Sequence, residues 1–206
     1  MAYQVKEIFY SLQGEGDRTG RAAVFCRFAG CNLWSGRAED RASAQCRFCD
    51  TDFVGSVGYD RSRLVVALLA AWPKSTHNPY VVCTGGEPLL QLDAALIDAL
   101  HASGCEVAVE TNGTRLVPIG VDWICVSPKA GVALVQTQGD ELKLVYPQAG
   151  MDPAAFASLR FKHFFLQPMD GPGPARAHNT ALAVEYCLAH PRWRLSLQAH
   201  KYLGIP

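Results

Sequence analysis

Short apolar segments alternate with longer helix-like segments along most of this chain, and this alternation constrains its fold more than any other feature. Runs of strand type occur at 22–28, 80–83, 106–109, 123–126, 142–146, 163–166 and 194–197. Helices are predicted over 62–71, 89–102 and 175–190. Alternation of this kind predicts an α/β fold, in which helices pack on a parallel sheet.

Polar residues follow the apolar part of several predicted strands. They are Thr84, Glu110, Ser127, Gln167 and Gln198. Parallel sheets and barrels carry their active sites at the carboxyl ends of their strands, so this set suggests a lined cavity. The chain has 206 residues, which is short for a full barrel of about 250 residues. A partial, open parallel β/α barrel is therefore expected.

Charge and hydropathy argue against two classes of protein, those that bind nucleic acid and those that span a membrane. Lysine and arginine together number 19, as do aspartate and glutamate, and no basic run stands out. This balance argues against a nucleic-acid partner. No apolar stretch is long enough to span a membrane, and the first residues lack the apolar core of a signal peptide, so a cytoplasmic protein is expected. Nothing divides the chain, which predicts one domain over 1–206 with a polar insertion at about 32–45.

Cys31, Cys46 and Cys49 are three thiols whose spacing allows them to meet at one point. Thiolates are soft ligands that select iron–sulfur clusters, zinc or copper. A structural zinc site needs a fourth protein ligand, and no cysteine or histidine lies close by in sequence. Three thiolates on a four-iron cluster leave one iron open. From spacing alone, a cluster and a structural zinc site remain nearly equal alternatives.

The segment 84–88, Thr-Gly-Gly-Glu-Pro, lies between a predicted strand and a predicted helix. Its glycines would let a ligand approach the backbone closely, and a helix start offers free amide donors. An ordinary strand-to-helix turn would have the same composition.

These motifs resemble those of a known enzyme family. The three cysteines, segment 84–88 and the Glu-Thr-Asn-Gly of 110–113 resemble the radical S-adenosylmethionine superfamily. A narrower set resembles the 7-carboxy-7-deazaguanine synthases of queuosine and deazapurine biosynthesis, and its pieces are 11–16, Arg27, 30–33, 49–51, 127–129, 167–170 and the ending at Pro206. The superfamily's usual spacing is Cys-x3-Cys-x2-Cys, whereas 32–45 separates the first two cysteines here. An inserted loop can bulge outward while its ends stay close.

The resemblance implies a radical-SAM type of fold and two cofactors. Cys31, Cys46 and Cys49 would hold a 4Fe-4S cluster, and its open iron would bind S-adenosyl-L-methionine (SAM). Reductive cleavage of SAM would release a 5′-deoxyadenosyl radical. The implied cofactor contacts are Phe48, Cys49, Asp50, Gly86, Ser127, Pro128, Lys129, Gln167, Pro168, Met169 and Asp170.

The implied reaction is that of a carbon–nitrogen lyase. It converts 6-carboxy-5,6,7,8-tetrahydropterin to 7-carboxy-7-deazaguanine with loss of ammonia. The implied substrate contacts are Leu12, Gln13, Gly14, Glu15, Arg27, Thr84 and Pro206, the last through its terminal carboxylate. Arg27 suits a carboxylate because a guanidinium can bond both oxygens, but it could equally pair with a buried glutamate. Thr51 matches the position of a magnesium contact.

The resemblance also implies a homodimer and an electron donor such as flavodoxin or ferredoxin. Glu110 is expected either to contact substrate or cofactor or to pair with Lys129 or Arg115. His200 and Tyr202 would close the pocket or pack on its rim. Two alternatives remain at this point: another radical SAM enzyme, such as a glycyl-radical activase, and a non-catalytic binding module stabilised by zinc.

Overall fold

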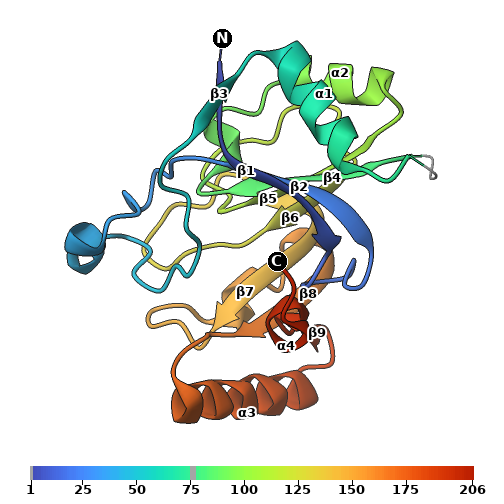
Figure 1. The fold of residues 1–206 in the computed structure, drawn as a ribbon. Coiled ribbons are helices and arrows are strands. Elements are labelled where there is room, and N and C mark those ends of the chain that lie inside the picture. Colours follow the sequence, from blue (N-terminus) through green and yellow to red (C-terminus); the bar gives the residue numbers. More distant parts are fainter. Residues whose placement is uncertain (1, 75–77) are drawn as a thin grey trace.

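One curved β-sheet forms the centre of the computed structural model, which describes residues 2–74 and 78–206. Within these residues the sheet has nine strands in the order β3-β1-β2-β4-β5-β6-β7-β8-β9 (Figure 1). The strands are β1 Tyr3–Leu12, β2 Ala22–Phe28, β3 Val57–Tyr59, β4 Tyr80–Gly85, β5 Glu106–Thr111, β6 Trp123–Val126, β7 Gln138–Tyr146, β8 Arg160–Pro168 and β9 Trp193–Leu195.

Strand direction confirms the predicted α/β fold and its open sheet. Neighbouring strands from β2 through β9 pair in parallel, whereas β1 is antiparallel to both β2 and β3. The order begins at β3 and ends at β9, so the sheet is a partial barrel. The carboxyl ends of seven parallel strands consequently face one side of the molecule.

Three longer helices cover the sheet in two groups. α1 (Arg61–Ala71) and α2 (Ala94–Ala102) lie together over the strands near β1 and β5, whereas α3 (Gly173–Ala189) packs on β7, β8 and β9 (Figure 1). Asp60 and Asp93 cap the first two helices by accepting hydrogen bonds from backbone amides of the first turn. Each group closes its own apolar core against the sheet. None of the described helices is long and apolar enough to cross a membrane.

Several short elements differ from those predicted from the sequence. The helix predicted over 89–102 is broken: a 3₁₀ turn at Pro88–Leu90 precedes α2. The structure also contains α4 (Ala199–Leu203), and 3₁₀ turns at Ala38–Ser43 and Pro153–Phe156. The strand predicted over 194–197 ends earlier, at Leu195.

Two strands were not predicted from the sequence. β1 carries Lys6 and Glu7 in its middle, and no two consecutive residues along it are buried. β3 is short and lies at the edge of the sheet. Their pairing with β2 and with each other is antiparallel, which the alternation of strands and helices does not reveal.

Candidate active site

A cavity of about 390 Å³ opens at the carboxyl ends of the parallel strands. This volume lies within the range of small-molecule sites. The structure brings together in its wall all the site residues predicted from the sequence except Pro128, which is described but is not among the lining residues. The wall also contains residues that were not predicted as site residues, and these include Glu7, Phe9, Thr111, Asn112, Lys143, Gln198 and Lys201.

The insertion at 32–45 bulges outward while its ends meet at the cavity. Its 3₁₀ turn projects away from the sheet (Figure 1). The backbone oxygen of Leu33 accepts hydrogen bonds from the amides of Gln45, at 3.0 Å, and Cys46, at 3.4 Å. Trp34 meets Phe53 edge to face, with ring centroids 5.5 Å apart. These contacts explain how Cys31 reaches the Cys-x-x-Cys pair despite the long spacing.

The three thiols form a donor set of one chemical kind. The Cys46 thiol donates to Cys49 and lowers the pKa of Cys49 to about 6, whereas burial raises the pKa of Cys31. Within the described residues, no group of three or more His, Cys, Asp or Glu side chains is placed to hold a single metal ion. A polynuclear cluster is larger than one ion and separates its thiolates further. Three soft thiolates on a cavity wall therefore fit a four-iron cluster.

The turn at 84–88 lies directly against the loop that carries Cys31. The amide of Gly86 donates to the backbone oxygen of Phe28 at 3.1 Å, and that of Glu87 to Gly30 at 2.9 Å. A Cβ atom at Gly86 would lie 2.1 Å from the oxygen of Gly30, so the close approach requires glycine. The turn thus fixes the start of the cysteine loop.

Glu87 is a fully buried carboxylate whose role the sequence did not single out. Its Oε1 accepts from the Leu89 amide at 3.0 Å and the Thr111 hydroxyl at 2.7 Å, and its Oε2 accepts from the Asn112 amide at 2.8 Å. Burial raises its pKa. Glu87 therefore joins the turn at 84–88 to the 110–113 motif, and the presence of both motifs was the only sequence signal for this contact.

Glu110 lies on the cavity wall, and its partners are not the ones expected. Gln13 Nε2 donates to its Oε1 at 2.8 Å, and the Thr84 hydroxyl donates to its Oε2 at 3.3 Å. Lys143 Nζ is 4.0 Å from Oε1. Of the two alternatives for Glu110, the ion pair with Lys129 or Arg115 is not found among the described residues, because the nearby cation belongs to strand β7. A contact with substrate or cofactor stays a prediction.

Arg27 lines the cavity and also pairs with a carboxylate. Its Nε donates to Glu7 Oε1 at 2.7 Å. The Glu7 side chain is 47% exposed, so this partner is not the buried glutamate considered from the sequence. The guanidinium lies 5.6 Å from the centre of the Phe9 ring.

Lys129 is a partly buried cation facing the cysteine pair. Its Nζ donates to both the backbone oxygen and the hydroxyl of Ser127, at 2.5 and 2.7 Å. Burial lowers its pKa, while Cys46 and Cys49 oppose that effect. Lys129 thus brings positive charge to the side of the cavity where the thiolates lie.

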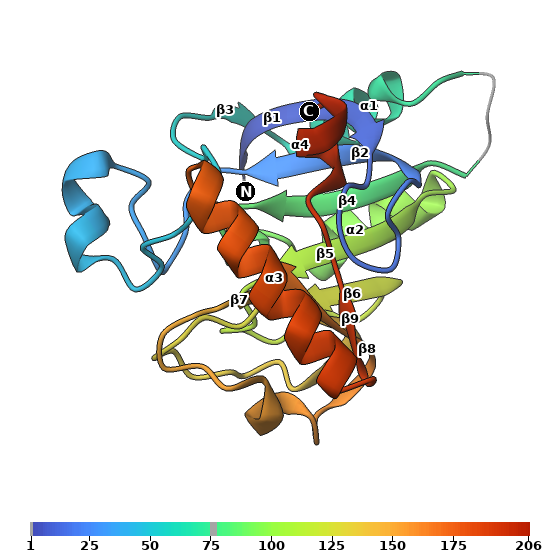
Figure 2. The same ribbon diagram turned by 90° about the horizontal axis from the view of Figure 1, so that it is seen from below.

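The carboxyl-terminal segment covers another side of the cavity. α4 and the end of the chain lie near β1 (Figure 2), where Ser11 Oγ donates to the backbone oxygen of Pro206 at 2.8 Å. Lys201 Nζ contacts Asp50 and Asp170, each at 2.5 Å. His200 lines the cavity, whereas Tyr202 is 65% exposed and is not among the lining residues.

Proteins of known name match this chain over its whole length. The chain is 63% identical over 212 residues to the 7-carboxy-7-deazaguanine synthase of Bordetella pertussis and 61% identical over 212 residues to that of Caulobacter vibrioides, covering each protein fully. The crystal structure of QueE from Escherichia coli matches with a TM-score of 0.72 at 27% identity, over 97% of this chain and 95% of that one. No family model matches the chain. Its full-length relatives establish that the chain belongs to the 7-carboxy-7-deazaguanine synthase family.

Proposed function

We propose that this protein converts 6-carboxy-5,6,7,8-tetrahydropterin to 7-carboxy-7-deazaguanine with release of ammonia. It belongs to a lyase family of deazapurine and queuosine biosynthesis, whose radical chemistry requires an iron–sulfur cluster and SAM. The observation that carries the proposal is a single cavity lined both by Cys31, Cys46 and Cys49 and by the charged residues suited to a carboxylated pterin.

The residues of the chain would divide the work by position in the cavity. When bound together, the cluster and SAM supply a 5′-deoxyadenosyl radical that removes a hydrogen atom from the substrate. The three cysteines would hold the cluster. The proposed SAM wall consists of Phe48, Asp50, Gly86, Ser127, Pro128, Lys129, Gln167, Pro168, Met169 and Asp170. Their placement around the cavity, Pro128 excepted, supports this assignment.

Elsewhere in the same cavity, the pterin would meet a mixed set of donors and acceptors. Arg27 would bind its carboxylate, which a guanidinium can bond through two parallel hydrogen bonds. Glu110 and Gln13 would face the polar edge of the ring system. The remaining proposed contacts are Leu12, Gly14, Glu15, Thr84 and the terminal carboxylate of Pro206.

A magnesium ion would join the site through Thr51. A threonine hydroxyl, waters and a substrate carboxylate form a reasonable shell, because Mg²⁺ retains several waters. We further propose that residues 1–206 form one domain with an insertion at about 32–45, that the protein acts as a homodimer, and that flavodoxin or ferredoxin reduces the cluster.

Anaerobic reconstitution tests the proposed function directly. The protein is loaded with iron and sulfide and then given reductant, SAM, carboxytetrahydropterin and magnesium. We expect carboxydeazaguanine and ammonia in equal amounts, with neither formed by Cys46→Ala prepared in the same way. Protein that contains zinc but takes up no iron or sulfide would be a zinc-stabilised module instead. Cleavage of SAM without carboxydeazaguanine would indicate another radical SAM enzyme, such as a glycyl-radical activase.

Replacing Arg27 tests how the substrate carboxylate is bound. A charged hydrogen bond contributes about 1.5–3 kcal/mol, so Arg27→Ala should raise the KM for the pterin by about 10- to 100-fold. Reductive cleavage of SAM in the absence of substrate should persist. Arg63→Ala is the matched control, because Arg63 lies on α1 and contacts Tyr59 outside the cavity. An unchanged KM in Arg27→Ala would remove this residue from the proposed substrate site.

A further inference from the structure

Lys143 is a buried cation in the cavity wall to which the proposed function assigns no role. It lies on β7, and its side chain is only 5% exposed. Its Nζ lies 2.5 Å from Glu15 Oε2 and 4.0 Å from Glu110 Oε1. A charge this deeply buried is costly unless it is paired, so the pair with Glu15 requires an explanation.

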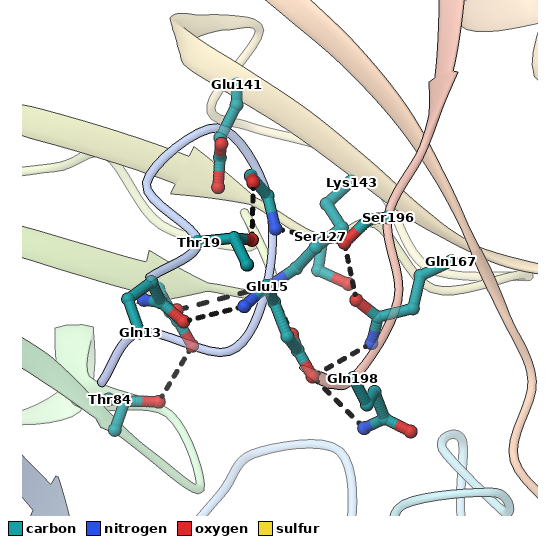
Figure 3. A network of polar contacts seen from close by, with 12 residues as sticks. Gln13, Glu15, Thr19, Thr84, Ser127, Glu141, Lys143, Gln167, Ser196 and Gln198 are labelled. Carbon is teal, nitrogen blue, oxygen red and sulfur yellow. Dashed lines mark hydrogen bonds and ion pairs between the residues drawn. The ribbon is translucent and has the colours of Figure 1, made fainter. Parts of the chain in front are cut away.

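Glu15 is held by donors from two neighbouring strands and from the segment that follows β9. In addition to the bond from Lys143, its Oε1 accepts hydrogen bonds from Gln167 Nε2 and Gln198 Nε2, each at 3.0 Å (Figure 3). Gln167 belongs to β8, and Gln198 follows β9. The carboxylate of Glu15 therefore connects the segment after β1 with the far side of the open sheet.

The backbone that follows Glu15 also contacts the far side of the open sheet. The amide of Gly16 donates to Ser196 Oγ at 2.9 Å, and the amide of Asp17 donates to Glu141 Oε2 at 2.9 Å. Arg194 Nη1 contacts Asp17 Oδ1 at 2.6 Å. Gly16 has φ +68°, and a Cβ there would lie 2.4 Å from Glu141 Oε1. Residues 13–17, here called the crossing segment, are thus fitted closely to strands β7 to β9.

We propose that Lys143 is a positioning residue whose ammonium keeps Glu15 ionised and aimed into the cavity, so that Gln13 and Glu15 can bind the pterin. This inference rests on the proposed function. Lys143 does not itself bind the substrate; it acts through Glu15. Gln13 is included because its Oε1 accepts from the Glu15 amide at 3.1 Å while its Nε2 holds Glu110.

The electrostatics of the pair support this role. Burial would raise the pKa of Glu15, but the charge and hydrogen bond of Lys143, with Gln198 and His200, lower it to about 2. Burial likewise opposes ionisation of Lys143, but the groups around it raise its pKa well above the usual value; they are Cys125, Glu110, Glu15 and Glu141. Without Lys143, the burial of Glu15 would favour its protonated form.

Kinetics of four variants test the proposal. Lys143→Met keeps most of the side-chain volume and removes the charge, Glu15→Gln removes the carboxylate, and the double variant removes both. Loss of a charged hydrogen bond to a bound substrate weakens binding by about 10- to 100-fold, so each single variant should lose about that much kcat/KM, mainly through KM. The double variant should be no worse than either single one. Lys162→Met is the control, because Lys162 pairs with Asp140 and its side chain is 71% exposed.

The dependence of kcat/KM on pH distinguishes a positioning role of the Lys143 charge from a loss of packing. In the wild type, Glu15 stays ionised across the neutral range. In Lys143→Met the raised pKa of Glu15 should make kcat/KM increase with pH, and the double variant should lack that dependence. Lys143→Arg keeps the charge and should keep the wild-type profile. A Lys143→Met profile parallel to that of the wild type, or additive losses in the double variant, would overturn the proposal.

An experiment on the protein without cofactors distinguishes failure of this inference from failure of the proposed function. The carboxylate absorption of Glu15 is obtained from infrared difference spectra between proteins with and without Glu15→Gln, recorded against pH. We expect Glu15 to ionise at a higher pH in Lys143→Met than in the wild type, whatever the substrate is. If Lys143→Met does not fold, Glu15→Gln decides, since wild-type kcat/KM in that variant would contradict the role assigned to Glu15.

Discussion

At the scale of single residues, the site depends on close contacts that leave no room for another side chain. Gly86 is the clearest case, because its backbone lies against Gly30 next to the first cysteine. Glu87 then fixes the same turn by accepting three hydrogen bonds while fully buried. The motif at 84–88 therefore acts through its backbone and its buried carboxylate, and both support the cysteine loop.

Replacing Gly86 tests this contact. Because the added Cβ would lie 2.1 Å from a backbone oxygen, Gly86→Ala should lower the free energy of unfolding by about 1–3 kcal/mol. It should also lower the iron bound after reconstitution, since Cys31 is displaced. Gly173→Ala is the control: nothing lies within 4 Å of its Cβ position, and a change within about 0.5 kcal/mol is expected. Chemical denaturation and iron analysis measure both effects, and a Gly86→Ala protein equal to wild type would contradict the argument.

At the scale of elements, α4 is held by ion pairs and hydrogen bonds more than by apolar packing. None of its five residues is buried. Lys201 joins it to Asp50 in the cysteine loop and to Asp170 after β8. The hydrogen bond from Lys201 lowers the pKa of Asp170, so this ion pair persists above the usual carboxyl range and weakens only as pH falls through that lowered pKa.

Removing the Lys201 charge should loosen the end of the chain. An exposed ion pair contributes up to about 1 kcal/mol, so amide exchange over 199–206 should become about two- to fivefold faster in Lys201→Met. Lys162→Met is the control, because it removes an ion pair with Asp140 that includes neither α4 nor its partners. Hydrogen exchange read by mass spectrometry makes the comparison. Equal exchange in Lys201→Met and wild type would show that other contacts hold α4.

At the scale of the whole molecule, the two largest apolar cores share one continuous sheet. One lies beneath α1 and α2, and the other lies beneath α3. β5, β6 and β7 connect the two through parallel pairing, and the segment after β1 spans the same distance. Loss of packing in one core should therefore destabilise the other. This is what the proposed single domain predicts.

Leu96→Ala tests whether the two cores unfold together. Leu96 is a fully buried residue of α2, and truncating such a side chain costs about 2–5 kcal/mol. Tryptophan fluorescence and far-ultraviolet circular dichroism should shift to the same lower denaturant midpoint. Val66→Ala, at a residue 66% exposed on α1, should change little. Two separate transitions would show that the α3 core folds independently.

Local chemistry explains what could be predicted. Apolar runs and helix-forming segments predicted the central parallel strands, because burial imposes a periodicity on neighbouring residues. The spacing of Cys31, Cys46 and Cys49 and the polar strand ends predicted a cavity wall. Strand β1 escaped prediction because Lys6 and Glu7 interrupt its apolar pattern.

The sequence by itself determined the α/β class, the polar residues at the ends of the parallel strands and the three sulfur donors. Each of these is a property of residue types at short spacing. Only the tertiary structure decided that Lys143 pairs with Glu15, that Glu110 faces Lys143 and that α4 closes one side of the cavity. Those contacts join segments that are far apart along the chain. They depend on how the sheet curves and where the crossing segment passes, and no short-range pattern encodes either.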